Sequence, residues 1–320
     1  MAGKTNRALI WIGLVAGLLL LAEVNVCCGS ILLTPFGNWS PIEEQIVWQL
    51  RLPKMLTAIL AGMALSVSGM LMQTLFRNPL AGPYILGVSS GAGLGVAIVT
   101  LAGVQLTLGI AGSAIIGSTA VLMLILAVSR KVRDNINLLI VGMMCGAIAG
   151  ALVNMLQNIS NPDALKMFIV WTLGSLSNVG WNQLAVLSAI VALGTLIAVG
   201  LIKPLNGLIL GETNARGLGI NVEHIRTWIV IATALLAGGV TAFCGPIAFV
   251  GVAVPHIARG IMRTNDHRQI MPATALIGAN LLLICDILCS ISTYPLPIST
   301  MSALFGAPII IWIIVRNKDR

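Results

Sequence analysis

The sequence predicts an all-α membrane protein that crosses the bilayer about ten times. Of its 320 residues, 58% are hydrophobic and only 9% are Asp, Glu, Lys or Arg, whereas an average soluble protein carries roughly 25% charged residues. So few charges cannot cover a water-facing surface of this size, which excludes a soluble cytosolic enzyme. A crossing helix with its share of loop takes roughly 30 residues. Residues 1–320 are therefore expected to form a single transmembrane domain in contact with membrane lipid.

The basic residues predict the orientation of this domain. Fifteen of the 18 Lys and Arg residues occur in clusters separated by long apolar stretches. Because cytoplasmic loops are enriched in Lys and Arg, we place every cluster inside, and each stretch must then hold an even number of crossings. Five helical hairpins follow, with both termini in the cytoplasm and only Arg51, Lys54 and Lys166 outside. The net charge of +8 thus indicates orientation and gives no reason to expect a nucleic-acid partner.

The apolar runs between these clusters set the approximate limits of each helix. The first run follows Lys4 and Arg7 and is expected to remain as a helix, because no A-x-A signal-peptide cleavage site follows it. The hairpin that turns at Gly245-Pro246 is short for two crossings, and such segments are tolerated only beside protein or a cavity. In chain order, the predicted helices are 8–29, 54–75, 83–103, 108–129, 136–157, 183–202, 227–243, 246–263, 270–290 and 298–315.

The longest inner loop is too amphiphilic to be a simple linker. Its sequence between the basic residues 203 and 226 is KPLNGLILGETNARGLGINVEHIR. Residues Glu212–Leu218 are expected to form a short helix, with an acidic start, Arg216 near its end and Gly219 as a left-handed cap. A short capped helix held out from the membrane is suited to docking another protein, and we assign this role to residues 204–222.

Motifs for chemistry within the chain are weak. The GVSSG sequence (87–91) matches the G-x-S-x-G pattern of hydrolases, but it lies in a glycine-rich apolar helix. We find no catalytic residues, no carboxylate pair of a proton relay and no metal-ligand spacing. Gly142, Gly146 and Gly150 share one helix face, which suits close helix packing within the bundle, a subunit interface or the wall of a transport pathway.

Several segments together resemble one family of membrane transporters. The matching segments are RLPKMLTAILAGMALSVSGMLMQTLFRNPLAGPYILGVSSGAG (51–93), LGETNARGLGINVEHIR (210–226), CGPIAFVGVAVPHIARG (244–260), DHR (266–268) and LFGAPIIIWIIVR (304–316). Over about residues 45–316 the sequence is similar to FecCD-type permeases, the membrane subunits of type II ABC importers for iron-siderophores, haem and cobalamin.

This resemblance implies an inner-membrane homodimer of ten-helix subunits, the type II ABC importer permease fold. Two ABC ATPase subunits beneath it would bind ATP and Mg²⁺, so this chain would carry no cofactor. A periplasmic or lipid-anchored binding protein would deliver the substrate from above. Iron-siderophore is the first expectation for the substrate, with cobalamin or haem as alternatives. An ion-coupled secondary transporter is the alternative class, although it would need a buried carboxylate pair, which we do not find in the sequence.

The resemblance also implies roles for individual residues. Arg51 and Lys54 would dock the binding protein, although Ser290 stands near a place where family members can carry a further basic residue. Gly142, Gly146 and Gly150 would wall the pathway at the dimer axis. The residues that would contact the ATPase are Glu212, Ala215, Arg216, Leu218 and Gly219, and those that would form a cytoplasmic gate are Asn78, Pro79 and Leu80.

Overall fold

A computed structural model describes residues 2–29, 33, 39–104, 109–129, 135–292 and 296–317. Within these ranges the chain forms helices and no β-strand. In chain order the elements are α1 (Ala2–Cys27), α2 (Pro41–Ile46), η1 (Val47–Arg51), α3 (Leu52–Phe76), η2 (Pro83–Leu86), α4 (Val88–Thr100), α5 (Gly109–Ser129), α6 (Asn135–Ile159), α7 (Pro162–Thr172), α8 (Trp181–Gly200), α9 (Ile202–Ile209), α10 (Glu212–Gly217), α11 (Val222–Thr233), η3 (Ala234–Gly238), α12 (Gly239–Cys244), α13 (Val250–Met262), α14 (His267–Ile291) and α15 (Ile298–Asn317).

The helices confirm the predicted fold class. In the part of the chain that the structure describes, seven helical segments are long and apolar enough to cross a membrane, and three more are apolar but shorter. Two of the long segments run through a π-helical turn, at η1 between α2 and α3 and at η3 between α11 and α12. The protein is therefore an all-α, multi-pass membrane protein.

Two predicted helices are interrupted in the structure. The predicted range 83–103 contains the 3₁₀ turn η2 and then α4, with Gly87 between them at a φ of 73°. The predicted range 246–263 contains α13, which begins only at Val250 because Gly245 and Phe249 have φ values of 74° and 65°. An L-residue helix cannot continue through such left-handed positions, so the chain bends at each of them.

The centre of the bundle is α3, which is buried along most of its length. Glycines bring its neighbours unusually close: Gly62 lies against Gly278 of α14, and Gly69 lies against Gly251 of α13. A Cβ atom at any of these four positions would overlap the facing backbone or a facing side chain. Small residues at helix contacts allow this close approach in lipid, where van der Waals packing replaces the hydrophobic effect between helices.

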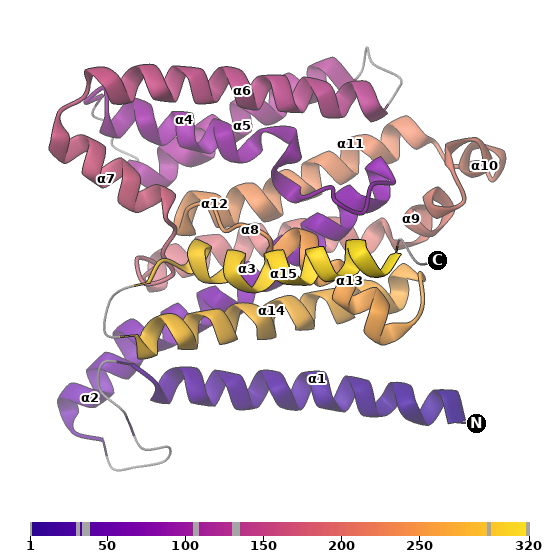
Figure 1. The fold of residues 1–320 in the computed structure, drawn as a ribbon, viewed down its shortest axis with the longest axis horizontal. Coiled ribbons are helices and arrows are strands. Elements are labelled where there is room, and N and C mark those ends of the chain that lie inside the picture. Colours follow the sequence, from indigo (N-terminus) through magenta and orange to yellow (C-terminus); the bar gives the residue numbers. More distant parts are fainter. Residues whose placement is uncertain are drawn as a thin grey trace.

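Different elements lie at the two ends of the bundle (Figure 1). The start of α1, the end of α15, the turn between α13 and α14, and the short helices α9 and α10 all lie at one end. Helices α2 and α7 lie at the opposite end. We call these the inner end and the outer end, following the orientation that the basic residues predict. Both termini of the described chain thus belong to the same end, as an even number of crossings requires.

Candidate coupling segment, inner turn and outer ion pair

The predicted coupling segment forms two short helices, α9 and α10, at the inner end (Figure 1). Gly211, with a φ of 101°, separates them, and Gly219, with a φ of 79°, follows α10. The N–H groups of Gly219 and Ile220 donate to the carbonyl groups of Arg216 and Ala215, each at 3.0 Å. This pair of bonds is a Schellman motif, in which a left-handed glycine satisfies the last carbonyls of a helix. The predicted left-handed conformation of Gly219 is confirmed.

Two ion pairs hold α10 to the start of α11. Nη2 of Arg226 lies 3.8 Å from Oε1 of Glu212, and the Arg226 side chain is 1% exposed. On the surface, Nη2 of Arg216 lies 3.2 Å from Oε1 of Glu223. An exposed pair contributes at most about 1 kcal/mol, whereas a buried charge that loses its partner is far more costly. Glu212 therefore helps to fix the position of α10 through Arg226.

The side chains predicted to meet an ATPase differ in accessibility. Leu218 is 64% exposed and Leu210, just before α10, is 59% exposed, so two apolar side chains stand free at the inner end. Ala215 is fully buried. Its side chain supports the packing of α10 and does not reach a surface that another protein could contact.

The predicted inner turn is held by hydrogen bonds from two directions. Helix α3 ends at Arg77, which is left-handed with a φ of 47°. Oδ1 of Asn78 then accepts the N–H of Leu80 at 2.9 Å, which fixes the turn. From α13, Nε2 of His256 donates to the carbonyl oxygen of Pro79 at 2.7 Å. Leu80 itself is 48% exposed at the tip of the turn, free of the bundle's core.

The glycines of α6 lie mainly against this chain's own bundle. A Cβ atom at Gly142 would meet the backbone of Ile85 and Leu86, and one at Gly146 would approach Ser90. Gly150 has open space around its Cα. The structure thus places the first two glycines at a contact within the chain. The exposed face of α6 is apolar and rich in methionine; its exposed large side chains include Ile140, Met143, Met144, Ile148, Leu152 and Met155.

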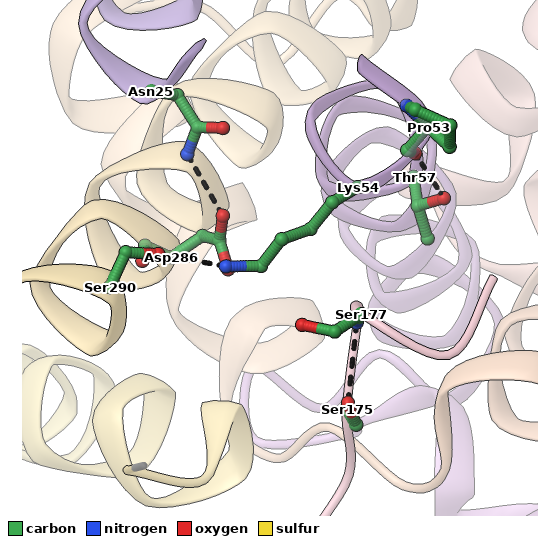
Figure 2. Close-up of polar contacts among 8 residues, drawn as sticks. All are labelled: Asn25, Pro53, Lys54, Thr57, Ser175, Ser177, Asp286 and Ser290. Carbon is green, nitrogen blue, oxygen red and sulfur yellow. Dashed lines mark hydrogen bonds and ion pairs between the residues drawn. The ribbon is translucent and has the colours of Figure 1, made fainter. Parts of the chain in front are cut away.

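At the outer end, Lys54 belongs to a buried ion pair (Figure 2). Its Nζ lies 2.9 Å from Oδ1 of Asp286 and donates to Oγ of Ser290 at 2.8 Å. The other carboxylate oxygen of Asp286 accepts from Nδ2 of Asn25 at 2.9 Å. Asp286 is 3% exposed and Lys54 is 22% exposed. The cluster ties α1, α3 and α14 together, and it neutralises most of the charge that Lys54 could offer to a docking partner.

Arg51 is also engaged within the chain. Its Nη1 donates to the carbonyl oxygens of Val26 at 2.7 Å and Cys27 at 3.0 Å, at the last turn of α1. A cationic side chain at this place interacts favourably with the negative, C-terminal end of the α1 helix dipole. Beside it opens a cavity of about 290 Å³, whose polar lining includes Asn25, Arg51, Lys54 and Ser290. Among the described residues, no group of three His, Cys, Asp or Glu side chains is placed to hold a metal ion.

Comparison with known proteins assigns the chain to a family. Residues 9–316 match the profile of the FecCD transport family. The chain is a member of the FecCD transport family. It is the permease of an ABC importer.

FecCD relatives match almost the whole chain. The vitamin B12 import system permease protein BtuC of Citrobacter koseri is 36% identical, over 98% of this chain and 97% of its own length. BtuC of Vibrio cholerae is also 36% identical, over 91% of this chain and 89% of its own length. The chain is thus similar to these proteins from end to end.

Solved structures agree with the fold. A structure described as an inward-facing conformation of a metal-chelate type ABC transporter matches with a TM-score of 0.90 and 31% identity, over 97% of this chain and 99% of that one. The PsaBC structure from Streptococcus pneumoniae, in complex with Fab, matches with a TM-score of 0.61 and 15% identity, over 81% of this chain. The second match supports the fold alone.

Several residues at these sites were not assigned a partner from the sequence. An acidic residue in an apolar helix is a signal of function or pairing. Asp286 is such a residue, but the sequence does not indicate that Lys54 and Asn25 are its partners. Arg226 counts only as an inner basic residue in the sequence, and its burial against α10 depends on the fold. His267 begins a helix in the DHR motif, where nothing indicates its contacts with α3 and α9.

Proposed function

We propose that this FecCD permease imports cobalamin across a bacterial inner membrane. The observation that carries the proposal is the end-to-end similarity to permeases named for vitamin B12 import. The iron-siderophore that the sequence analysis placed first has less support, because the similar permeases are named for vitamin B12. A cobalt-containing corrinoid is itself a metal chelate, so the likeness to a metal-chelate type transporter is compatible with this cargo.

The working assembly that we propose has two copies of this chain, two ABC ATPase subunits and a substrate-binding protein. The exposed apolar face of α6 supports a contact with the second copy, since such a face needs a partner or lipid. The exposed Leu210 and Leu218 beside α10 support docking of the ATPase at residues 204–222. ATP and Mg²⁺ would bind to the ATPase, and this chain would supply the pathway and the coupling segment.

In the proposed cycle, the binding protein releases cobalamin into an outward-open space between the two permease copies. ATP-driven closure of the ATPases displaces α9 and α10, and the bundle then opens inward, as alternating access requires. Asn78, Pro79 and Leu80 would narrow the inner end of the pathway. A large cargo suits a wide path between two copies, lined by small and apolar side chains.

Uptake into proteoliposomes tests the proposal. The permease is reconstituted with the ATPase and binding protein of its own system, and uptake of labelled cobalamin, a ferric siderophore and haem is compared. We expect ATP-dependent uptake of cobalamin and little of the other two. Uptake of the siderophore or of haem in preference to cobalamin would reject the cargo but retain the importer.

The same vesicles distinguish an importer from an ion-coupled carrier. The buried acid Asp286 is ion-paired with Lys54, so this carboxylate is already engaged in a contact within the chain. We therefore expect uptake to continue when a proton uncoupler is added at constant ATP. Uptake that needs no ATPase, or that stops with the uncoupler, would favour the secondary transporter.

A further inference from the structure

A chain of hydrogen bonds links the coupling segment to the central helix. Nδ1 of His267, at the start of α14, lies 2.8 Å from Oδ1 of Asn206 in α9. Nε2 of the same ring lies 3.0 Å from Oγ1 of Thr74, in the last turns of α3. His267 is 2% exposed and Thr74 is 8% exposed, so water does not replace these contacts. One buried imidazole thus contacts both the coupling segment and α3.

The α9 end of this chain is fixed on more than one side. Oδ1 of Asn206 also accepts the backbone N–H of His267 at 2.9 Å, and Nδ2 of Asn206 donates to Oδ1 of Asp266 at 2.7 Å. The N–H of Arg268 donates to the same Asp266 oxygen at 3.0 Å. The bonds from Arg268 and Asn206 lower the pKa of Asp266, which keeps it an anionic acceptor. Because Oδ1 of Asn206 accepts, Nδ1 of His267 carries the proton.

The α3 end leads on to the inner turn. Gln73, next to Thr74, accepts at Oε1 from Nη1 of Arg259 at 2.6 Å, and its Nε2 donates to the carbonyl of Val252 at 3.0 Å. One turn before Arg259 on α13, His256 holds the carbonyl of Pro79. Hydrogen bonds, joined by helix backbone between Gln73 and Thr74 and between His256 and Arg259, therefore connect α9, α14, α3, α13 and the turn at residues 78–80.

We propose that His267 is a positioning residue for transport, which holds α9 to α3 so that movement of the coupling segment reaches the inner turn. The proposal rests on the proposed function, because it needs the segment at residues 204–222 to be moved by an ATPase. The physical reason is that a buried polar group remains bonded to its partner, since an unsatisfied one is costly. Displacing α9 therefore moves the ends of α3 and α14 with it, instead of sliding past them.

Two threonines of α3 provide a matched test. Oγ1 of Thr74 lies 3.0 Å from Nε2 of His267 and 2.9 Å from the carbonyl oxygen of Met70, which share its single hydroxyl proton, and Thr74→Val removes both contacts. Thr57→Val removes a local bond to the carbonyl of Pro53 (Figure 2), and Thr57 is also buried on the same helix. Cargo uptake and ATP hydrolysis are measured with the complete transporter in proteoliposomes. We expect Thr74→Val to lower the cargo taken up per ATP by about 3- to 10-fold and Thr57→Val to leave this ratio unchanged.

Variants of the ring separate its two contacts. His267→Asn retains an amide near the position of Nδ1 and loses the group that faces Thr74, so it should match Thr74→Val. Adding Thr74→Val to His267→Asn should then cause no further loss, because both changes break the same contact. Asn206→Leu should break the contact between α9 and His267, and it should also lower the cargo taken up per ATP.

A distance measurement keeps the proposal testable if a variant transports too poorly to assay. Spin labels at Thr213→Cys on α10 and Leu80→Cys on the inner turn report whether both move when ATP is added to the folded complex. We expect joint movement in the Thr57→Val background and movement of α10 alone in the Thr74→Val and Asn206→Leu backgrounds. Unchanged uptake per ATP in these two variants, or joint movement in them, would overturn the role of His267. Failure of the unsubstituted complex to take up any cargo with ATP would instead reject the proposed function.

Discussion

Gly219 is the residue whose conformation the coupling helix needs most. Its φ of 79° is in the left-handed region, yet no atom lies within 4 Å of the place where a Cβ would stand. A substitution there is therefore costly through backbone strain alone. Gly217, two residues earlier in α10, also has open space, but no left-handed φ. The two glycines differ in backbone conformation but not in the space around them, so comparing them isolates conformational strain.

We expect Gly219→Ala to destabilise α10 locally by about 1 kcal/mol, since left-handed L-residues carry this penalty. Gly217→Ala should stabilise the helix slightly, because Ala is the better helix former. Hydrogen exchange of the amides at residues 214–218 measures the free energy of local opening in both variants. Equal protection in the two variants would mean that the Schellman motif does not hold the end of α10.

Asp286 is expected to matter for folding because it keeps Lys54 paired. We expect Asp286→Asn to lower the free energy of unfolding by about 1–3 kcal/mol, a reduced figure because Lys54 is partly exposed. Asp163→Asn on the surface of α7 is the control and should have little effect. In a double-mutant cycle with Lys54→Met, the combined loss should be smaller than the sum of the two single losses. Additive losses in thermal unfolding would show that the two side chains are not coupled.

Asp286 also bears on docking of a binding protein, which stays a prediction for Arg51 and Lys54. With the carboxylate removed, Lys54 would present its full charge at the outer end. Asp286→Asn should then strengthen binding of an acidic binding protein at low salt and lose this effect as salt increases. Binding that does not respond to the substitution at low salt would count against Lys54 as a docking residue.

At the scale of elements, the inner turn offers a test of the proposed gate. Asn78 and His256 fix the turn, while Leu80 points out of the bundle with half its surface exposed. In a homodimer, Leu80→Cys in both copies should therefore form a disulfide in the state that is closed on the inner side, and nucleotide should change its yield. Non-reducing electrophoresis measures the crosslink, with Thr213→Cys on α10 as the control. Absence of the crosslink under every nucleotide condition would leave Leu80 as a turn residue only.

The limits of the elements show which signals the sequence carries. Charge clusters and apolar runs indicate where helices lie, because a charged side chain is unfavourable at almost any position within a membrane span. They do not indicate that the chain bends at Phe249, because phenylalanine has no local preference for the left-handed conformation that it adopts there. Nor do they reveal the π-turns at η1 and η3, each of which depends on how the surrounding helices pack.

At the scale of the whole molecule, the orientation of the two ends can be tested directly. Thr213 of α10 and Asn158 in the last turn of α6 are both exposed, and α10 and the junction of α6 with α7 lie at opposite ends of the bundle (Figure 1). Cysteine is placed at each position in a background in which the partly exposed Cys27, Cys28, Cys145 and Cys289 are replaced by Ser. An impermeant maleimide should label Thr213→Cys only from the cytoplasmic side and Asn158→Cys only from the periplasmic side. The reverse pattern would contradict the positive-inside orientation.

The sequence by itself determined that this protein is an all-α, multi-pass permease, because hydrophobicity, charge and the family motifs are properties of the chain read in order. It also predicted the left-handed conformation of Gly219, because glycine commonly adopts this conformation directly after the end of a helix. The tertiary structure alone decided which polar groups meet. Lys54 pairs with Asp286 across 232 positions of the chain, and His267 joins Thr74 to Asn206. Such contacts form only when packed helices bring distant residues within hydrogen-bond distance, and no local pattern specifies them.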